Sequence, residues 1–431
     1  MLEGGSESQK RTRQFEKERE FHQGRWESKA QADVQRGIWR RLLERNRTDK
    51  TAEDFMREEA DRDNADFDKR QLDEFKEWQD MLRVVIDNLK EKIRNPENKD
   101  AGGTLVLILG GGMKSAYGAG QVLGLHMVGL TADKVEMVGG SSGGAVDATA
   151  YAGGLEQILR GCSMMVEELG SKDFISKIRL GKLVNLPMLK GLMEEGEYAI
   201  DTEAIRKTPT ELRFTMTLPV EGQQDPQVRI LDAKTMKPGM VDGIVSTMSI
   251  PNATGPIPEI DGVKYYDGGF VPLPIDEYIE EYTRSIGAPP KNILILPQTP
   301  FEEMENIRPT NKEIKFADLL RKQAGSLTEA GSLGNAALLS QIEKGLLLKH
   351  QLRESLEIIQ KRKDVNIGIL WPPDMGLGSL TIDGDDMKAA ILESARAVIR
   401  EFGQKQPDEM PWYISERGKL RNAIRNFQQA A

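Results

Sequence analysis

Two glycine-rich turns, each lying between an apolar run and a helical pattern, constrain the fold of this chain more than any other feature. In the first unit the apolar run 104–109 breaks at the three glycines of 110–112 and continues as a helical pattern. In the second, the apolar run 135–138 passes through Gly-Gly-Ser-Ser-Gly-Gly at 139–144 into small, helix-compatible residues at 145–151. The order strand, tight turn, helix therefore occurs twice, and strands that alternate with helices predict an α/β layered fold.

The first turn predicts an anion site and the second a nucleophile. Glycines at a helix N-terminus leave backbone N–H groups exposed, where partial positive charge gathers. The second turn satisfies G-x-S-x-G, in which glycines relieve the crowding of a sharp strand-to-helix turn that presents a serine. Both 139–143 and 140–144 fit this pattern, so the residues alone leave Ser141 and Ser142 open as the nucleophile.

Two other interpretations of the first glycine turn fit less well. A phosphate-binding P-loop needs glycine before its Lys-Ser pair, but Met113 precedes Lys114 and Ser115. In a dinucleotide fingerprint that begins at Gly110, the third glycine would fall on Ser115, and no acidic residue clearly takes the ribose-binding place. An oxyanion loop is favoured only because the serine turn follows; alone, the glycines would indicate close helix packing.

A carboxylate, rather than a histidine, is the candidate base for the serine. His22 lies in the charged N-terminal part, His126 in the helix after the first glycine turn, and His350 in a helical run. None follows a strand, so each is interpreted as structural or exposed. Asp267, in Tyr-Asp-Gly-Gly, is flanked by glycines that allow close approach. An aspartate in a turn is on its own usually a cap, and its low pKa, about 3.9, makes it a poor base without help from burial or the serine.

Composition narrows the class of protein. A net charge of −9 argues against binding nucleic acid and against strong attraction to anionic membranes. The single cysteine, Cys162, excludes an internal disulfide framework and a cysteine-rich zinc site, and it fits a reducing compartment. Neither a secretory signal nor a run near the ~20 apolar residues of a membrane span is present in the sequence. The cytoplasm is therefore the expected location.

Three parts are predicted along the chain. Residues 1–100 form a charged helical extension, with apolar residues at helical spacing between 72 and 93. It is expected to pack on the core or to self-associate, and the alternative is a membrane-docking or regulatory arm. Residues 101–404 form the main domain, with a helical section at 301–362, and 405–431 form a basic tail.

Further elements are predicted within the main domain. A Met- and Leu-rich, lid-like section around 178–193 is interpreted as core, with the lining of an acyl-chain channel as the alternative. Strands and helices are predicted from hydrophobic pattern and from Gly and Pro positions: strands at 212–218, 228–231, 292–296 and 365–371, and helices at 241–250 and 387–402.

Three motifs in order resemble those of the patatin-like phospholipase family. GGGMKS resembles its oxyanion motif, GSSGG followed by AVDATAYAGG its nucleophile turn and helix, and YYDGG its aspartate element; STMSIPNATGP resembles a further family segment. The resemblance covers roughly 103–300 and extends more weakly to about 403. It implies a three-layer α/β/α fold with a mostly parallel central sheet. Ser115 stands where the family usually has glycine, and Lys114 replaces the commoner arginine, which keeps the charge without the bidentate fork.

The resemblance also implies a function and its residues. Counting back from Tyr151-Ala-Gly-Gly places the nucleophile on Ser142, with Asp267 as its base. The implied activity is hydrolysis of phospholipid or other long-chain acyl esters, without a metal or organic cofactor. The implied supporting residues are the oxyanion donors Gly111, Gly112 and Gly143, the loop residues Gly110 and Lys114, and the turn glycines Gly140 and Gly144.

Two alternatives to this function stay open on the sequence. The first is a lipid-binding or assembly protein that keeps the fold and has little catalysis, with the charged extension as its working part. The second is a soluble esterase or thioesterase that never visits a membrane. The main hypothesis places a cytoplasmic enzyme in peripheral contact with membrane lipid.

Overall fold

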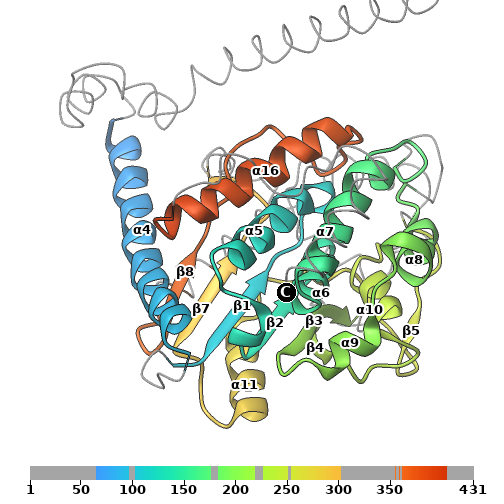
Figure 1. The fold of residues 1–431 in the computed structure, drawn as a ribbon, viewed down its shortest axis with the longest axis horizontal. Coiled ribbons are helices and arrows are strands. Elements are labelled where there is room, and N and C mark those ends of the chain that lie inside the picture. The colour runs from blue at the N-terminus through green and yellow to red at the C-terminus, as the bar shows by residue number, and fades with distance from the viewer. Residues whose placement is uncertain are drawn as a thin grey trace, which may run out of the picture. The chain divides into compact units, whose positions relative to one another are not determined.

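A computed structural model describes residues 65–96, 102–175, 183–218, 227–250, 254–301, Ser355, Ile359 and 362–404, with side chains from residue 76 onward. The chain divides into two units, Met1–Lys76 and Glu77–Ala431. The fold described below is that of the second unit (Figure 1).

The core of the fold is a mixed, mostly parallel sheet of six strands in the order β4-β3-β2-β1-β7-β8. Every neighbouring pair is parallel except β3 and β4, which are antiparallel. This confirms the predicted α/β/α class. The strands are β1 (Thr104–Ile108), β2 (Met137–Gly140), β3 (Glu211–Leu218), β4 (Gln227–Asp232), β7 (Asn292–Leu296) and β8 (Asn366–Ile369); β5 (Glu259–Ile260) and β6 (Val263–Lys264) form a separate hairpin.

Helices connect and cover the strands (Figure 1). The long helices of the described residues are α4 (Ala65–Arg94), α5 (Ser115–Met127), α6 (Gly143–Ala152), α7 (Leu155–Met164), α11 (Ile275–Ile286) and α16 (Gly384–Glu401). The shorter ones are α8 (Leu186–Glu194), α9 (Thr202–Lys207), α10 (Met240–Thr247) and the single turns η3 (Gly112–Lys114), η4 (Ala132–Lys134), η5 (Met165–Leu169), η6 (Gly196–Tyr198) and η7 (Gly268–Phe270).

The two faces of the sheet are buried against different helices. Val106, Val138 and Leu294, which are paired across β2, β1 and β7, share one hydrophobic core with α5 and α16. On the other face, Gly139 of β2 gives space to the ring of Tyr278 from α11. Burial on both faces explains why these strands are continuous apolar runs rather than alternating ones.

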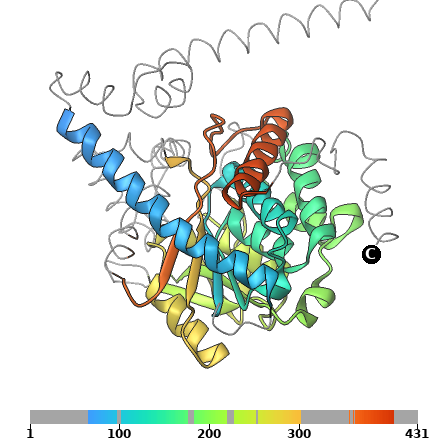
Figure 2. The same ribbon diagram turned by 60° about the vertical axis from the view of Figure 1, so that its left-hand side comes forward.

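Helix α5 owes its close packing to small residues. A Cβ at Gly120 would lie 2.2 Å from the Ile391 carbonyl oxygen of α16, and one at Gly124 would lie 2.6 Å from Val398 Cβ. The glycines that look like helix breakers in the sequence therefore let α16 lie directly on α5, as Figures 1 and 2 show from two sides.

The second half of α4 belongs to the compact unit. Trp78, Val85 and Leu89 are buried, and Val85 lies against Gly368 of β8. Figure 2 shows α4 beside α16 and β8. Lys92 near its end donates to Glu136 at 2.7 Å, so the helix predicted at 72–93 is anchored on the sheet. The domain boundary at residue 100 stays a prediction, since the unit already includes Glu77.

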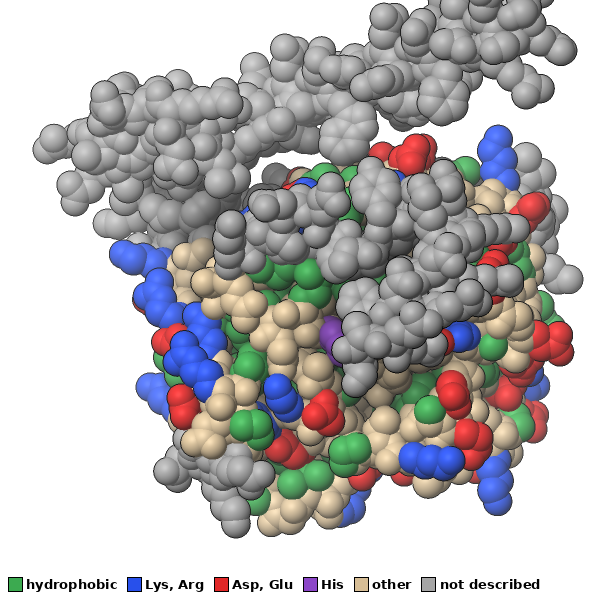
Figure 3. Space-filling model, viewed as in Figure 1, with side chains coloured by type: hydrophobic (Ala, Val, Ile, Leu, Met, Phe, Trp, Pro, Cys, Tyr) green, Lys and Arg blue, Asp and Glu red, His purple; other side chains and the backbone are tan. Residues whose placement is uncertain are grey.

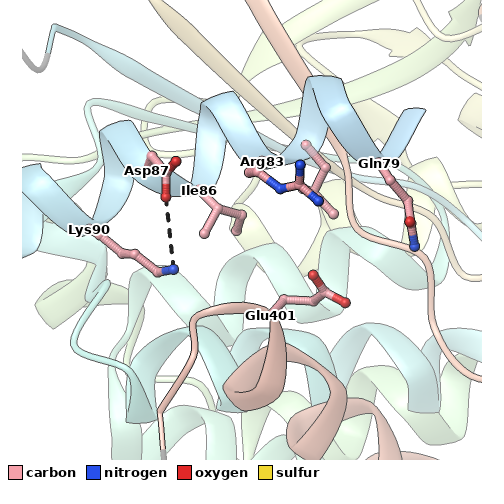
Figure 4. A pocket seen from close by; sticks show the side chains of 7 residues that line it. Gln79, Arg83, Ile86, Asp87, Lys90 and Glu401 are labelled. Carbon is pink, nitrogen blue, oxygen red and sulfur yellow. Dashed lines mark ion pairs between the residues drawn. The ribbon is translucent and has the colours of Figure 1, made fainter. Parts of the chain in front are cut away.

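A polar pocket of about 270 Å³ lies between α4 and the end of α16. Its lining consists of Gln79, Leu82, Arg83, Ile86, Asp87, Lys90 and Glu401 (Figure 4). Lys90 and Asp87 form an ion pair of 3.9 Å within it. None of these residues comes from either glycine turn.

Most of the Met- and Leu-rich section lies in the core. Leu183, Leu186, Leu189 and Met193 are buried in or beside α8. Its residues 178–182 and the basic tail at 405–431 lie outside the described residues, and so does the predicted helical section at 301–362 apart from Phe301, Ser355, Ile359 and Arg362. No helix of the described part meets the length and apolarity that crossing a bilayer requires.

We expect Leu89→Ala to lower the free energy of unfolding by about 2–5 kcal/mol, because Leu89 is fully buried where α4 meets the core. The matched control on the same helix is Val84→Ala, since Val84 is 50% exposed and its change should stay within about 0.5 kcal/mol. Denaturant unfolding of both variants measures the difference. Equal effects would contradict the anchoring of α4.

Candidate active site

The first glycine turn leaves β1 at the point where the strand order changes direction. The chain runs from β1 to β2 and β3 on one side, whereas β7 and β8 lie on the other. Clefts at such points, beyond the carboxyl ends of the strands, are the usual ligand sites of open α/β sheets. Gly110 and Gly111 are buried there, and Gly112 has φ +59, a conformation that favours glycine.

The loop is tied down on its far side. Met113 N–H donates to the Ser379 carbonyl at 3.0 Å, and Lys114 N–H donates to the Gly111 carbonyl at 3.1 Å. Lys114 is buried, and its Cβ lies near Gly111. A turn closed by its own backbone and by a distant segment keeps its N–H directions fixed.

The second turn is a strained strand-to-helix turn centred on Ser142. Ser142 has φ 50 and ψ −132, outside the regions that non-glycine residues normally occupy. A Cβ at Gly144 would lie 2.4 Å from the Ile108 carbonyl oxygen, and one at Gly140 would lie 2.6 Å from the Gly144 carbonyl oxygen. Both glycines are thus required by close approach of backbone, and it is Ser142, not Ser141, that takes the strained position.

The two glycine turns touch each other. A Cβ at Gly143 would lie 2.8 Å from Ser115 Cβ and 3.0 Å from the Gly112 carbonyl oxygen. Ser115, one of the two departures from the motif noted above, therefore packs against the turn that carries Ser142. The amides of Gly111, Gly112 and Gly143 make no hydrogen bond within the described residues, so they are available to an incoming acceptor.

Ser142 and Asp267 meet although 125 residues separate them. The Ser142 hydroxyl donates to Asp267 Oδ2 at 2.7 Å, and both residues are buried. Asp267 stands at the start of η7, where its Oδ1 accepts the Gly269 N–H at 2.7 Å. Gly268 cannot be replaced freely, because a Cβ there would lie 2.4 Å from the Thr215 carbonyl oxygen.

Neighbouring hydroxyl groups hold both partners, and the sequence did not single them out. Thr247 Oγ1 accepts the Ser142 N–H at 3.1 Å and donates to the Thr215 carbonyl at 2.6 Å. Thr217 Oγ1 donates to the Asp267 carbonyl, and Asp267 N–H donates to the Ser249 carbonyl, each at 2.8 Å. Thr247 and Ser249 belong to the STMSIPNATGP segment, and the resemblance of this segment to a family segment was the signal in the sequence that could have pointed to them.

Burial changes the acidity of the carboxyl group. Loss of hydration raises the pKa of Asp267 to about 6, and the hydrogen bonds from Gly269 and Ser142 oppose that rise. At neutral pH the group is mainly ionised, yet it is a far better proton acceptor than an aspartate in water.

No histidine bonds to the serine hydroxyl among the described residues. His126 lies in the last turn of α5, where burial lowers its pKa and its Nδ1 has no partner within the described part of the chain. His22 and His350 lie outside the described residues. Where the structure describes side chains, it brings no three His, Cys, Asp or Glu groups together in a way that could hold a metal ion.

Comparison with known proteins assigns the domain. Residues 106–279 match the family model described as patatin-like phospholipase. The matched part includes both glycine turns and Asp267, so residues 106–279 are similar to the patatin-like phospholipase domain, whose family consists of lipid acyl hydrolases.

Structural similarity to a solved protein is weak. One match is a chain of the 1.92 Å crystal structure of full-length SpcU in complex with full-length ExoU from the type III secretion system of Pseudomonas aeruginosa. The identity is 14%, the match covers 76% of this chain and 77% of that chain, and the TM-score is 0.25. No curated protein matches the chain.

We expect Asp267→Asn to become more stable relative to the wild type as pH rises from about 4 to 7. The folded-state pKa of Asp267, about 6, lies above its usual value, so the native state holds the proton more tightly than the unfolded state. Wild-type stability therefore falls as pH rises through this window, whereas Asn does not titrate. The relative gain should reach about 3 kcal/mol in denaturant unfolding, and a pH-independent difference would contradict the raised pKa.

Proposed function

We propose that the chain hydrolyses carboxylic esters of lipids through a Ser142–Asp267 dyad and an acyl-enzyme. The observation that carries the proposal is the 2.7 Å hydrogen bond from the Ser142 hydroxyl to Asp267 Oδ2. A base that already accepts the nucleophile's hydrogen bond needs no rearrangement before proton transfer.

In the first half-reaction Ser142 Oγ attacks the acyl carbonyl carbon while its proton passes to Asp267 Oδ2. The carbonyl π electrons move onto oxygen, which becomes an oxyanion. When this intermediate collapses, the bond to the alkoxy group breaks and Asp267 returns the proton to the departing oxygen. An alcohol leaves, and the acyl group stays esterified to Ser142.

In the second half-reaction water takes the place of the alcohol. Asp267 accepts a proton from water as the water oxygen attacks the acyl-enzyme carbonyl. Collapse of this second intermediate breaks the bond to Ser142 Oγ, which recovers its proton from Asp267. The carboxylic acid leaves, and Ser142 and Asp267 return to their starting protonation states.

The amides of Gly111, Gly112 and Gly143 are the proposed donors to the oxyanion. They come from the two turns that touch, and they have no hydrogen-bond partner within the described residues. A donor of this kind is worth about 3 kcal/mol of transition-state stabilisation. Gly110, Gly140, Gly144 and Lys114 are proposed to keep the loops in place.

Long-chain acyl esters, phospholipids among them, are the proposed substrates, and a cytoplasmic location with peripheral membrane contact is proposed with them. Among the described residues, the large apolar side chains that are at least about a third exposed are Val84, Val263, Ile286 and Ile382. Figure 3 shows basic and acidic side chains distributed over the described part of one face.

We expect Ser142→Ala to abolish turnover of a p-nitrophenyl ester, and Asp267→Asn to lower kcat at least 10²-fold, because each removes one partner of the proton transfer. Ser141→Ala is the matched control, since it changes the neighbouring serine of the same turn and should keep most activity. Steady-state assays measure all three. An inactive wild type, or a fully active Ser142→Ala, would overturn the proposal in favour of a lipid-binding protein.

We expect kcat/KM to rise with pH with a midpoint at about 6. Asp267 must be ionised to accept the proton, and burial raises its pKa to about 6. Below the midpoint the carboxyl is protonated and the serine hydroxyl loses its base. A pH–rate profile measures the midpoint, and a midpoint near 4 would contradict control of the step by an Asp267 of raised pKa.

The substrate is identified by incubating the protein with mixed phospholipid vesicles and analysing the released fatty acids and lysolipids. Vesicle flotation alongside this assay separates the two enzymatic alternatives. Turnover of short esters with neither vesicle binding nor lipid products would favour an esterase or thioesterase that does not act at membranes.

A further inference from the structure

A second buried side-chain pair lies directly behind the first glycine turn. Gln298, two residues beyond the end of β7, donates from Nε2 to Asp147 Oδ2 at 2.8 Å. Asp147 lies in the second turn of α6, the helix that begins after Ser142. The pair therefore links the helix of the nucleophile to the strand on the opposite side of β1.

The Gln298 side chain lies against the glycine loop itself. A Cβ at Gly111 would lie 2.5 Å from Gln298 Oε1 and 2.7 Å from Gln298 Cβ. Real Cβ atoms do not approach other atoms this closely, so Gly111 and Gln298 are in direct contact only because residue 111 is glycine. Any movement of Gln298 changes the surface on which this part of the loop rests.

Helix α5 has a glycine, Gly118, where it contacts the same pair. A Cβ at Gly118 would lie 2.3 Å from Asp147 Oδ2 and 2.7 Å from Gln298 Nε2. The pair is thus enclosed between α6, α5 and the loop, with glycine at both points of closest contact. Two unrelated glycine positions that fit one hydrogen-bonded pair indicate a defined polar element within the core.

Asp147 is a buried carboxyl group held by a hydrogen bond rather than by an ion pair among the described residues. Its side chain is 2% exposed, and no Lys or Arg of the described residues forms an ion pair with it. Gly118 faces it from α5 and Gln298 from the segment after β7, and Asp147 in turn helps to raise the pKa of the buried Cys162 thiol of α7. Burial raises the pKa of Asp147 well above its usual value, because an unpaired buried carboxylate is strongly disfavoured.

Burying the polar pair has a free-energy cost, so the filling of space does not account for its presence. Gln298 Oε1 is buried and has no partner within the described residues, and an unsatisfied buried acceptor is destabilising. Apolar side chains of similar size would fill the same space without that cost. A hydrogen bond fixes the orientation of a side chain, which apolar packing does not do, and the pair therefore points to a role in orienting its neighbours.

We propose that Asp147 and Gln298 are positioning residues: Asp147 fixes the Gln298 amide, and Gln298 holds Gly111 of the oxyanion loop in its catalytic place. This inference rests on the proposed function of the loop. Neither residue touches the reacting atoms, so the pair acts only through the loop. Loss of the pair should therefore reduce the stabilisation of the transition state more than it reduces the binding of substrate.

The principal test removes the hydrogen bond and keeps the volume. Gln298→Met and Asp147→Leu should each lower kcat for a p-nitrophenyl ester about 10-fold or more, with KM changed less than about twofold, because an oxyanion interaction is made in the transition state. Asp147→Asn keeps a neutral acceptor for Gln298 Nε2 and should retain kcat within about threefold. Loss of activity in Asp147→Asn equal to that in Asp147→Leu would overturn the proposed role.

A second readout follows the loop without using catalysis. Met113 and Lys114 amides are hydrogen-bonded in the loop, so hydrogen–deuterium exchange of a peptide over 109–115 reports its order. Gln298→Met should speed that exchange about 10-fold. Thr149→Val is the matched control on α6: it removes the buried hydrogen bond from Thr149 to the Ala145 carbonyl, and it should leave both the exchange at 109–115 and kcat near the wild-type values.

The two readouts separate failure of this inference from failure of the proposed function. If the wild type has no esterase activity, the proposed function fails, and the exchange of 109–115 in Gln298→Met still decides whether the pair orders the loop. Unchanged exchange in Gln298→Met overturns the inference whatever the kinetics. Faster exchange in Thr149→Val to the same extent also overturns it, since any buried hydrogen bond of α6 would then serve equally.

Discussion

The hydrogen bond between the Ser142 hydroxyl and the Asp267 carboxylate is the contact on which the remaining geometry of the site depends. It joins two turns that are distant in sequence, and its donor, Ser142, has a strained backbone conformation. That strain is compensated by the surroundings: glycine at 140 and 144 lets the backbone close, and Thr247 Oγ1 holds the Ser142 amide. The site is therefore preorganised by backbone packing rather than by charge pairing.

Contacts from distant segments also hold the glycine loop at 110–112 in place. Ser115 packs on Gly143, the Ser379 carbonyl holds Met113, and Gln298 lies on Gly111. These contacts come from α5, from the segment before α16 and from the end of β7. Residues from across the sheet hold this loop in place, because its glycines have no side chains that could do so. The lysine that replaces arginine contributes here as a buried group of the turn.

Local pattern was sufficient for most of the elements and insufficient for the contacts between them. Apolar runs predicted β1, β2, β3, β7 and β8 within a few residues, because parallel strands buried on both faces are continuous apolar stretches; the short run at 228–231 predicted the antiparallel strand β4. The helix predicted at 72–93 is the described α4, but its docking on β8 was not predictable. Periodicity reveals an apolar face and says nothing of its partner. The sequence did not predict a role for Asp147 or Gln298, because a single Asp in a helix and a single Gln after a strand form no motif.

The sequence by itself determined the chemistry that the site can use: two glycine turns, a serine pair, an aspartate beside glycines, and no histidine following a strand. Only the tertiary structure decided which serine takes the strained position, how far it lies from Asp267 and what that carboxyl's acidity becomes. The physical reason is that hydrogen bonding and desolvation depend on distance and on excluded water. Both arise when segments far apart in the chain close on one another, and neither is written in any single segment.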